Sequence, residues 1–221
     1  MSLSRETEVI FDSRRGQDYH SANPPLYDSS TFHQTVLGGN AQYDYARSGN
    51  PNRTLLEEKL ARLEGGKYAF AYASGIAAIT AVLLTLKSDD HVILPDDIYG
   101  GTLRLTEQIL NRFNIKFTTV NATNILEIKN AIQSNTKLIY VETPSNPLFK
   151  ITDIRAVARI AKQNNLLLAV DNTFMTPLGQ SPLALGADIV VHSATKFLGG
   201  HSDLISRSAI NTRKYIAASL Y

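Results

Sequence analysis

The sequence predicts an α/β domain built on a mostly parallel β-sheet with helices on both faces. Short apolar segments of strand length alternate with helix-like segments from residue 54 onward. Polar residues follow each apolar segment directly, as at the ligand-binding edge of such sheets. Hydrophobic residues make up 43% and charged residues 19%, a balance typical of a globular domain with a substantial core.

Residues 1–53 differ from the rest and are predicted to form an extended arm. They are rich in Asp, Ser, Tyr, Asn and Gly, and "SANPPLYDSSTFHQ" and "GGNAQYDYARSGNP" are typical of extended segments and turns. Such an arm has too little apolar surface to fold alone. We therefore expect it to lie on its own domain or on a neighbouring subunit.

Residues 54–221 are predicted to form one large domain. Its first helix should begin at Thr54, because Thr54 and Glu57 have the spacing of a capping box, and should end at Gly65 and Gly66. The following predicted elements alternate in the order strand 68–73, helix 75–86, strand 91–95, a helix after 101, strand 116–120, helix 124–133, strand 137–142, helix 151–163, strand 166–171, a proline-containing loop and strand 188–192.

Composition excludes several classes of function. The net charge is +2 with both signs interspersed, so no basic stripe predicts nucleic-acid binding. No apolar run approaches the ~18 residues of a membrane span, and the N-terminus lacks a signal-peptide pattern. Cysteine is absent, which rules out disulfides, thiolate metal sites and cysteine nucleophiles. His192 and His201 lack metal-site spacing, so we expect no metal and a cytoplasmic protein.

Polar residues after the predicted strands mark the expected binding site, because ligands of open α/β sheets bind beyond the carboxyl ends of the strands. These residues are Ser74–Gly75, Asp96–Tyr99, Glu142–Asn146, Asp171–Thr173 and Ser193–Lys196.

Each candidate has a plainer alternative. Ser74 and Gly75 open a helix whose bare amides could bind phosphate, or Ser74 could simply cap that helix. Asp171 could meet a cationic group or cap a loop. Lys196 could be a solvated loop lysine or could bind a carbonyl covalently.

Taken together, a phosphate cradle, a carboxylate and a lysine at strand ends are what pyridoxal 5'-phosphate (PLP) requires. The lysine holds the aldehyde, and the carboxylate keeps the pyridine nitrogen protonated. A nucleotide-binding oxidoreductase is a second hypothesis, but "ASGIAAI" lacks the G-x-G-x-x-G pattern that it needs.

Six motifs, in order, resemble the Cys/Met-metabolism family of PLP-dependent enzymes. They are "YDYARSGNPNR", "ASGIAAI", "DDIYGGT", "ETPSNP", "VDNTF" and "HSATKFLGGHSD". The resemblance implies the large domain of fold-type I PLP-dependent transferases, preceded by the N-terminal arm. It also implies a homodimer or homotetramer with shared active sites.

The same resemblance implies residue roles. Lys196 would carry the cofactor and act as the base, and Tyr99 would stack on the cofactor and assist proton transfer. The implied cofactor-binding set is Tyr45, Arg47, Gly75, Ile76, Tyr99, Asn146, Asp171, Thr173, Ser193, Thr195 and Lys196. Within it, Asp171 would pair with the pyridinium nitrogen, and Tyr45 and Arg47 would reach the phosphate of the neighbouring subunit.

The implied activity is that of a carbon–sulfur lyase acting on a small amino acid such as cystathionine. "STFHQ" and "DNTFMTP" look more like the bacterial cystathionine β-lyases, while γ-synthase and γ-lyase activity remain alternatives. Family chains continue into a C-terminal domain whose arginine binds the substrate carboxylate. This chain stops at Tyr221 and has Arg207 where the family usually has a small residue. A truncated, non-catalytic fragment is therefore a further alternative.

Overall fold

The computed structural model describes residues 4–10, 23–36, 38–39 and 41–220. The strands are β1 (Tyr68–Tyr72), β2 (His91–Pro95), β3 (Lys116–Val120), β4 (Thr136–Glu142), β5 (Leu167–Asp171), β6 (Ile189–Ser193) and β7 (Arg207–Asn211). The helices are α1 (Arg5–Ile10), α2 (Pro51–Glu64), α3 (Gly75–Leu83), α4 (Gly100–Gln108), the 3-10 helix η1 (Leu110–Phe113), α5 (Ile125–Asn130), α6 (Ile154–Gln163), α7 (Thr176–Gly179), α8 (Pro182–Leu185) and α9 (Lys214–Leu220).

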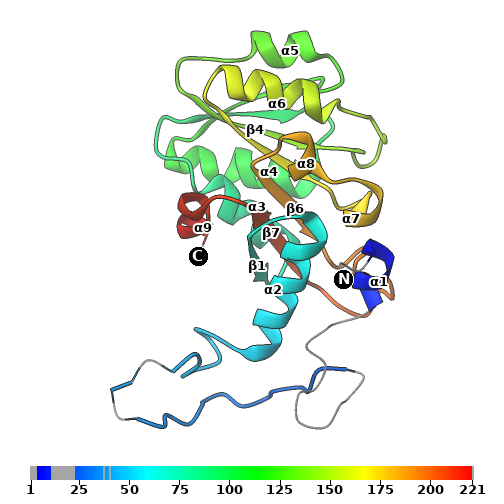
Figure 1. Ribbon diagram of the computed structural model, residues 1–221. Helices are drawn as coiled ribbons and strands as arrows, with labels where there is room; N and C mark the ends of the chain where they lie inside the picture. Colours follow the sequence, from blue (N-terminus) through cyan, green and yellow to red (C-terminus); the bar gives the residue numbers. More distant parts are fainter. Residues whose placement is uncertain (1–3, 11–22, 37, 40, 221) are drawn as a thin grey trace.

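The strands form one seven-stranded sheet in the order β1-β7-β6-β5-β4-β2-β3 (Figure 1). β7 runs antiparallel to β1 and β6, and the other pairings are parallel. The predicted fold class is therefore confirmed, but β7 has no counterpart among the predicted strands. Its sequence, "RSAIN", is polar at three of its five positions and carries little strand signal.

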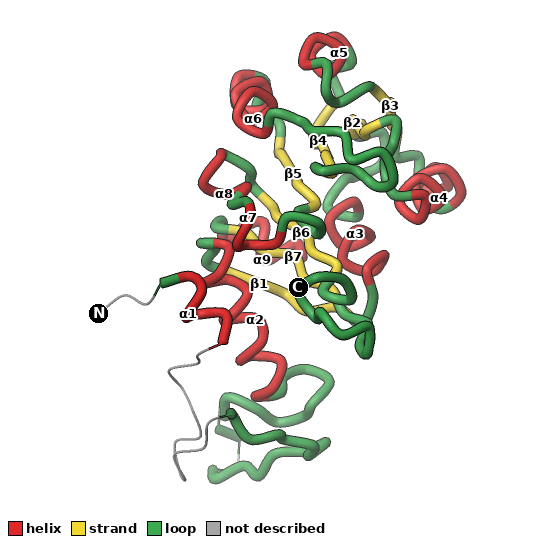
Figure 2. Tube along the Cα trace, turned by 90° about the vertical axis from the view of Figure 1, so that its right-hand side faces the viewer, coloured by secondary structure: helices red, strands yellow, loops and turns green. Residues whose placement is uncertain are grey.

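Helices cover both faces of the sheet (Figure 2). On one face, called here the α3 face, α3, α4 and α9 pack on alternate strand residues such as Leu138, Tyr140 and Val191. On the other, called the α6 face, α5 and α6 pack on residues such as Ile139 and Val170. α2 covers the β1–β7 end of the α6 face, where Leu60 meets the side chain of Ile210. The buried strands contribute side chains to both cores, which explains their continuous apolar runs.

The first large helix begins earlier than predicted. α2 starts at Pro51, with Asn50 as its N-cap, and the Asn50 side chain accepts the N–H of Asn52 at 2.8 Å. Thr54 and Glu57 do not form a capping box, because Glu57 Oε1 instead accepts the N–H of Ala71 on β1. The boundary between arm and domain, predicted between residues 53 and 54, therefore falls inside α2. Asn and Pro in the first positions are an equally good start signal.

The N-terminal arm is only partly extended. Its first described segment is helical (α1), contrary to prediction, and Arg5 Nη1 donates to Pro177 O at 2.9 Å. Farther along, Phe32 N donates to Asp44 O and Ala46 N donates to Ser30 O, both at 2.8 Å. Figure 1 shows this paired segment beyond the N-terminal end of α2, away from the sheet.

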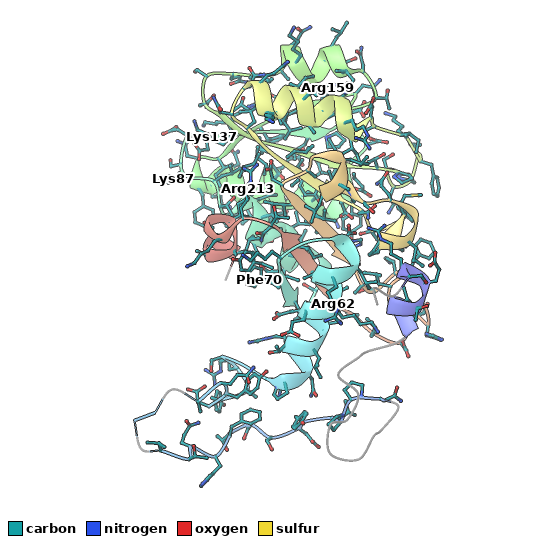
Figure 3. All side chains as sticks on the ribbon, in the orientation of Figure 1. Arg62, Phe70, Lys87, Lys137, Arg159 and Arg213 are labelled. Carbon is teal, nitrogen blue, oxygen red and sulfur yellow. The ribbon has the colours of Figure 1, made fainter. Side chains whose placement is uncertain are left out.

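The amino ends of the strands are closed by buried polar contacts. His91 at the start of β2 places Nδ1 2.8 Å from Thr136 Oγ1 and Nε2 2.9 Å from Thr118 Oγ1. Burial lowers the pKa of His91. Asp188, just before β6, accepts the N–H of Leu168 and pairs at 2.6 Å with Arg213, which is labelled in Figure 3.

The described residues contain neither a membrane-spanning helix nor a cluster of metal-binding side chains. No helix among them is long and apolar enough to cross a membrane. Across the same residues, no group of three or more His, Cys, Asp or Glu side chains is arranged to hold a metal ion.

Candidate active site

The carboxyl ends of β4, β5 and β6 bring several of the predicted residues together. Glu142 is the register partner of Asp171, and Asp171 is the partner of Val191. Because side chains alternate along a strand, these residues and Ser193 share the α3 face with Tyr140. Residues separated by more than twenty positions in the sequence thus meet at one edge.

Asp171 is held in a fixed orientation. The residue is buried (2% exposed), and its Oδ2 accepts from the Tyr140 hydroxyl at 3.2 Å. Its Oδ1 accepts from the Thr173 backbone N–H at 3.0 Å and from the Thr173 hydroxyl. These hydrogen bonds fix the directions of both carboxylate oxygens, so the arrangement suits a carboxylate that must meet a cation or an acidic N–H.

Thr173 links β5 to β6. Its Oγ1 accepts the backbone N–H of Ser193 at 2.8 Å while its hydroxyl hydrogen points to Asp171. Ser193 O in turn accepts the N–H of Lys196 at 3.1 Å. A continuous set of contacts therefore runs from Asp171 to the loop that carries Lys196.

Lys196 lies in the turn after β6 and is exposed. Gly199 N donates to Ala194 O at 2.7 Å and Gly200 N to Lys196 O at 2.9 Å, which coils the turn tightly. Within the described chain, Lys196 Nζ has no hydrogen bond or ion pair. The amine is thus available to an incoming carbonyl.

A hollow of ≈ 640 Å³ lies beside this lysine. It is lined by Phe174, Thr195, Lys196, Phe197, Gly200 and Ser202–Ile205. Phe174 forms the middle of an aromatic row, with ring centroids 5.5 Å from Phe149 and 5.9 Å from Phe197. Asp171 and Tyr99 do not line the hollow, so it borders the candidate site rather than containing it.

Tyr99 is positioned by Glu142 and Gly101. Its backbone N–H donates to Glu142 Oε2 at 3.0 Å, which ties the start of α4 to the end of β4. The ring is 43% exposed and lies so close to Gly101 that a Cβ there would meet ring carbon Cε1 at 2.4 Å. A glycine is therefore needed for this ring position, and the face of the ring remains available for stacking.

The start of α3 supplies backbone amides. Gly75 is the first residue of α3 and Ile76 the second, directly after β1. Ser74 makes no side-chain capping bond, so the plainer interpretation of Ser74 as a cap is not supported. N–H groups in a first helical turn favour anions such as phosphate.

Thr195 and Asn146 occupy less decisive positions. Thr195 Oγ1 donates to Ser206 O at 3.2 Å and accepts the Ser206 N–H at 3.0 Å, so its hydroxyl is engaged by the backbone. Asn146 is half-buried in the loop after β4, before a cis peptide bond to Pro147. Nearby, the carboxylate of Asp96, 2.9 Å from Lys150 Nζ, raises the pKa of that amine.

Tyr45 and Arg47 lie together in the arm. Arg47 Nη2 donates to the Tyr45 hydroxyl at 3.4 Å, and its Cζ lies 5.2 Å from the centroid of the Tyr45 ring. Figure 1 shows the segment that holds them beyond the N-terminal end of α2, away from the sheet. These two residues therefore stand apart from the rest of the predicted set within one chain.

Tyr140 supports the site but was not predicted, and Glu142 was expected at the binding edge without an assigned role. Their alternation in β4, with polar side chains at positions 140 and 142 of a buried strand, is a signal that could have identified them. Glu64 and His192, paired on the other face of the sheet, were also missed, because their contact spans 128 positions of sequence.

The residues present fit PLP. A buried carboxylate with both oxygens oriented, an exposed aromatic ring, a helix start and an exposed amine are the groups that this cofactor uses.

Comparisons with known proteins agree with this geometry. A sequence model of the family described as Cys/Met metabolism PLP-dependent enzyme matches residues 6–221. Cystathionine beta-lyase MetC of Staphylococcus haemolyticus (strain JCSC1435) is 82% identical over 221 residues, which are 100% of this chain and 56% of that protein. Cystathionine gamma-lyase of Bacillus subtilis (strain 168) is 46% identical over 99% of this chain and 58% of that protein.

A solved structure is similarly close. The crystal structure of cystathionine gamma-lyase from Lactobacillus plantarum complexed with L-serine matches with a TM-score of 0.92 and 42% identity, covering 99% of this chain and 57% of that one. The chain thus spans little more than half the length of these relatives. On the family match over residues 6–221, the chain belongs to the Cys/Met-metabolism family of PLP-dependent enzymes.

Proposed function

We propose that this chain provides the cofactor-binding part of a PLP-dependent carbon–sulfur lyase, and specifically of a cystathionine β-lyase. The observation that carries the proposal is the oriented Asp171 carboxylate connected through Thr173 and Ser193 to the turn of the exposed Lys196. The 82% identity to a protein named cystathionine beta-lyase supports the choice of reaction. Cystathionine and water would give homocysteine, pyruvate and ammonia by loss of the group on Cβ.

When bound, PLP supplies an electron sink for negative charge at the substrate Cα. Lys196 would attach the cofactor and would move the Cα proton, tasks that suit an exposed amine. Asp171 keeps the ring nitrogen protonated from its fixed position at the end of β5. Tyr99 offers its ring face for stacking.

The phosphate would be held by the Gly75 and Ile76 amides and the hydroxyls of Ser193 and Thr195, with Thr195 turning from its bond to Ser206. Asn146 and Thr173 would lie beside the cofactor. Because this is a set of neutral donors, a cationic partner for the phosphate is expected from elsewhere.

Arg47 and Tyr45 would supply that partner to a second copy of the chain. The arm that carries them extends away from its own sheet edge, which supports a homodimer or homotetramer with shared sites (Figure 1). Mixing Arg47→Ala and Lys196→Ala proteins should restore part of the lost activity, because each hybrid dimer keeps one site with both residues. Hybrids that form but remain inactive would place Arg47 outside the neighbour's site.

Product analysis tests the reaction itself. Purified protein with PLP and cystathionine should release pyruvate and homocysteine. Release of cysteine and 2-oxobutanoate would instead assign γ-lyase activity, in line with the 46% identical relative of that name.

Borohydride reduction followed by peptide mapping should find the pyridoxyl group on Lys196, and a label elsewhere would overturn the assignment. The cytoplasmic location stays a prediction.

A further inference from the structure

A buried acid–histidine pair lies behind the candidate site, on the opposite face of the sheet. His192 in β6 is 0% exposed and Glu64 at the end of α2 is 1% exposed. His192 Nε2 lies 2.5 Å from Glu64 Oε1. Because the partner is a carboxylate, Nε2 carries the hydrogen of this bond.

Asn172 completes the contact. This fully buried residue follows Asp171, and its Nδ2 donates to Glu64 Oε1 at 2.9 Å. Gln180 Nε2 donates to Asn172 Oδ1 at 2.9 Å and to Thr143 O at 3.1 Å. Glu64 thereby contacts the ends of β5 and β6 directly and the end of β4 through Gln180.

These contacts close a ring, called here the strand-end ring. Glu64 bonds to Asn172, which is followed in the chain by Thr173. Thr173 Oγ1 accepts the N–H of Ser193, which follows His192, and His192 returns to Glu64. The ring passes from the α6 face to the α3 face, so any movement of Glu64 reaches the side chains that face the cofactor.

The pair is unusual because it is incompletely satisfied. Glu64 Oε2 and His192 Nδ1 are buried, and neither has a hydrogen-bond partner among the described residues. Apolar side chains of similar size would avoid the cost of burying these atoms. A buried polar group that is retained without full satisfaction calls for an explanation beyond packing.

We propose that Glu64 and His192 are positioning residues for the cofactor site, acting through the strand-end ring on Asp171, Thr173 and Ser193. The inference rests on the proposed function, since these three residues are among those assigned to PLP. Glu64 contacts neither cofactor nor substrate; its effect is to fix Asn172 and, through Thr173, the hydroxyl that orients Asp171 Oδ1. Because Glu64 ends α2, the same contact anchors the helix from which the arm extends.

The experiment measures PLP affinity of the purified chain by spectroscopic titration in three variants. Glu64→Leu removes the oxygen that bonds to Asn172 and His192. It should raise the PLP dissociation constant about tenfold, the effect of losing one or two buried hydrogen bonds. Glu64→Gln keeps an oxygen for Asn172 and His192 and should change the constant less than about threefold. Leu60→Ala is the matched control, because it weakens the packing of α2 without touching the ring.

A merely structural role predicts a different pattern. If Glu64 only stabilised α2, Leu60→Ala and Glu64→Leu variants with equal losses of thermal stability would show equal losses of PLP affinity. The positioning role predicts normal affinity for the folded Leu60→Ala protein. Unchanged affinity in Glu64→Leu, with wild type binding PLP, would overturn the inference alone. Failure of the wild type to bind PLP would overturn the proposed function instead.

His192→Phe is a fourth variant and carries the test if Glu64→Leu does not fold. It keeps a ring of similar size without a donor and should weaken PLP binding as Glu64→Leu does. In the double variant the two losses should not add, because both break the same ring. Additive losses would show that the two residues act independently and would contradict the pairing.

Discussion

At the amino ends of the strands, His91 bonds to Thr118 and to Thr136, and Asp188 pairs with Arg213. At the carboxyl ends, Asp171 is oriented by hydrogen bonds while Tyr99 and Lys196 are exposed. Both ends carry buried polar residues, but among the described residues the buried Asp171 is linked through Thr173 and Ser193 to the turn of the exposed Lys196, whereas the buried Asp188 is paired with Arg213. Buried polar residues alone therefore do not mark the site; their connection to exposed, chemically capable side chains does.

The largest expected effect is a difference in turnover between variants of two exposed lysines, Lys196 and Lys162. Lys196→Ala should lower turnover at least about a thousandfold, because it removes both the proposed attachment point and the proposed base. Lys162→Ala, on the exposed side of α6 at the amino end of the sheet, should leave turnover unchanged. Steady-state assays of pyruvate release check both, and a substantially active Lys196→Ala protein would remove the lysine from the mechanism.

The next comparison uses the two buried aspartates. Asp171→Asn should lower kcat/KM by an amount that corresponds to more than about 2 kcal/mol of activation free energy, since it removes the charge proposed to face the ring nitrogen. Asp188→Asn should instead lower the free energy of unfolding, because the Arg213 pair and the Leu168 contact are weakened, while kcat/KM stays near normal. Kinetics and urea unfolding of both variants measure the contrast. An equal activity loss in both would show that the two ends are not functionally distinct.

The smallest expected effect is the pH dependence of stability at the amino end. Burial holds the pKa of His91 below its ordinary value, so the unfolded chain binds this proton at a higher pH than the folded chain. The free energy of unfolding should thus fall as the pH drops through the ordinary histidine pKa of about 6.5. His91→Gln should remove that part of the decrease, measured by urea unfolding at pH 7.5 and 5.5. The same slope in both proteins would contradict the assignment.

The predictable parts of this molecule are those set by local pattern. Continuous apolar runs such as Ile189–Val191 mark strands, and a carboxylate or lysine directly after such a run marks the binding edge. The family resemblance then indicated which lysine and which aspartate to assign to the cofactor. The start of α2 was misplaced because Thr54 with Glu57 and Asn50 with Pro51 are competing helix starts, and local sequence does not rank them.

The unpredicted parts depend on pairings between distant segments. Tyr140 supports Asp171 only because the β4–β5 register places them on one face. Glu64 meets His192 only because α2 packs over the β1–β7 end of the sheet. No pattern within a short window of sequence encodes such contacts, since they are fixed by topology and register.

The position of β7 has a consequence for synthesis. β7 is the hydrogen-bonded neighbour of both β1 and β6, yet residues 73–206 are made after β1 and before β7. At about 5–20 residues per second, a ribosome needs roughly 7–30 s to make them. Throughout that interval β1 lacks its β7 neighbour, and once β6 has been made it presents a bare edge until β7 follows, the kind of surface that invites pairing with other chains. The last of the seven described strands thus joins the first to the rest of the sheet, and protection of the nascent chain matters most just before residue 207 emerges.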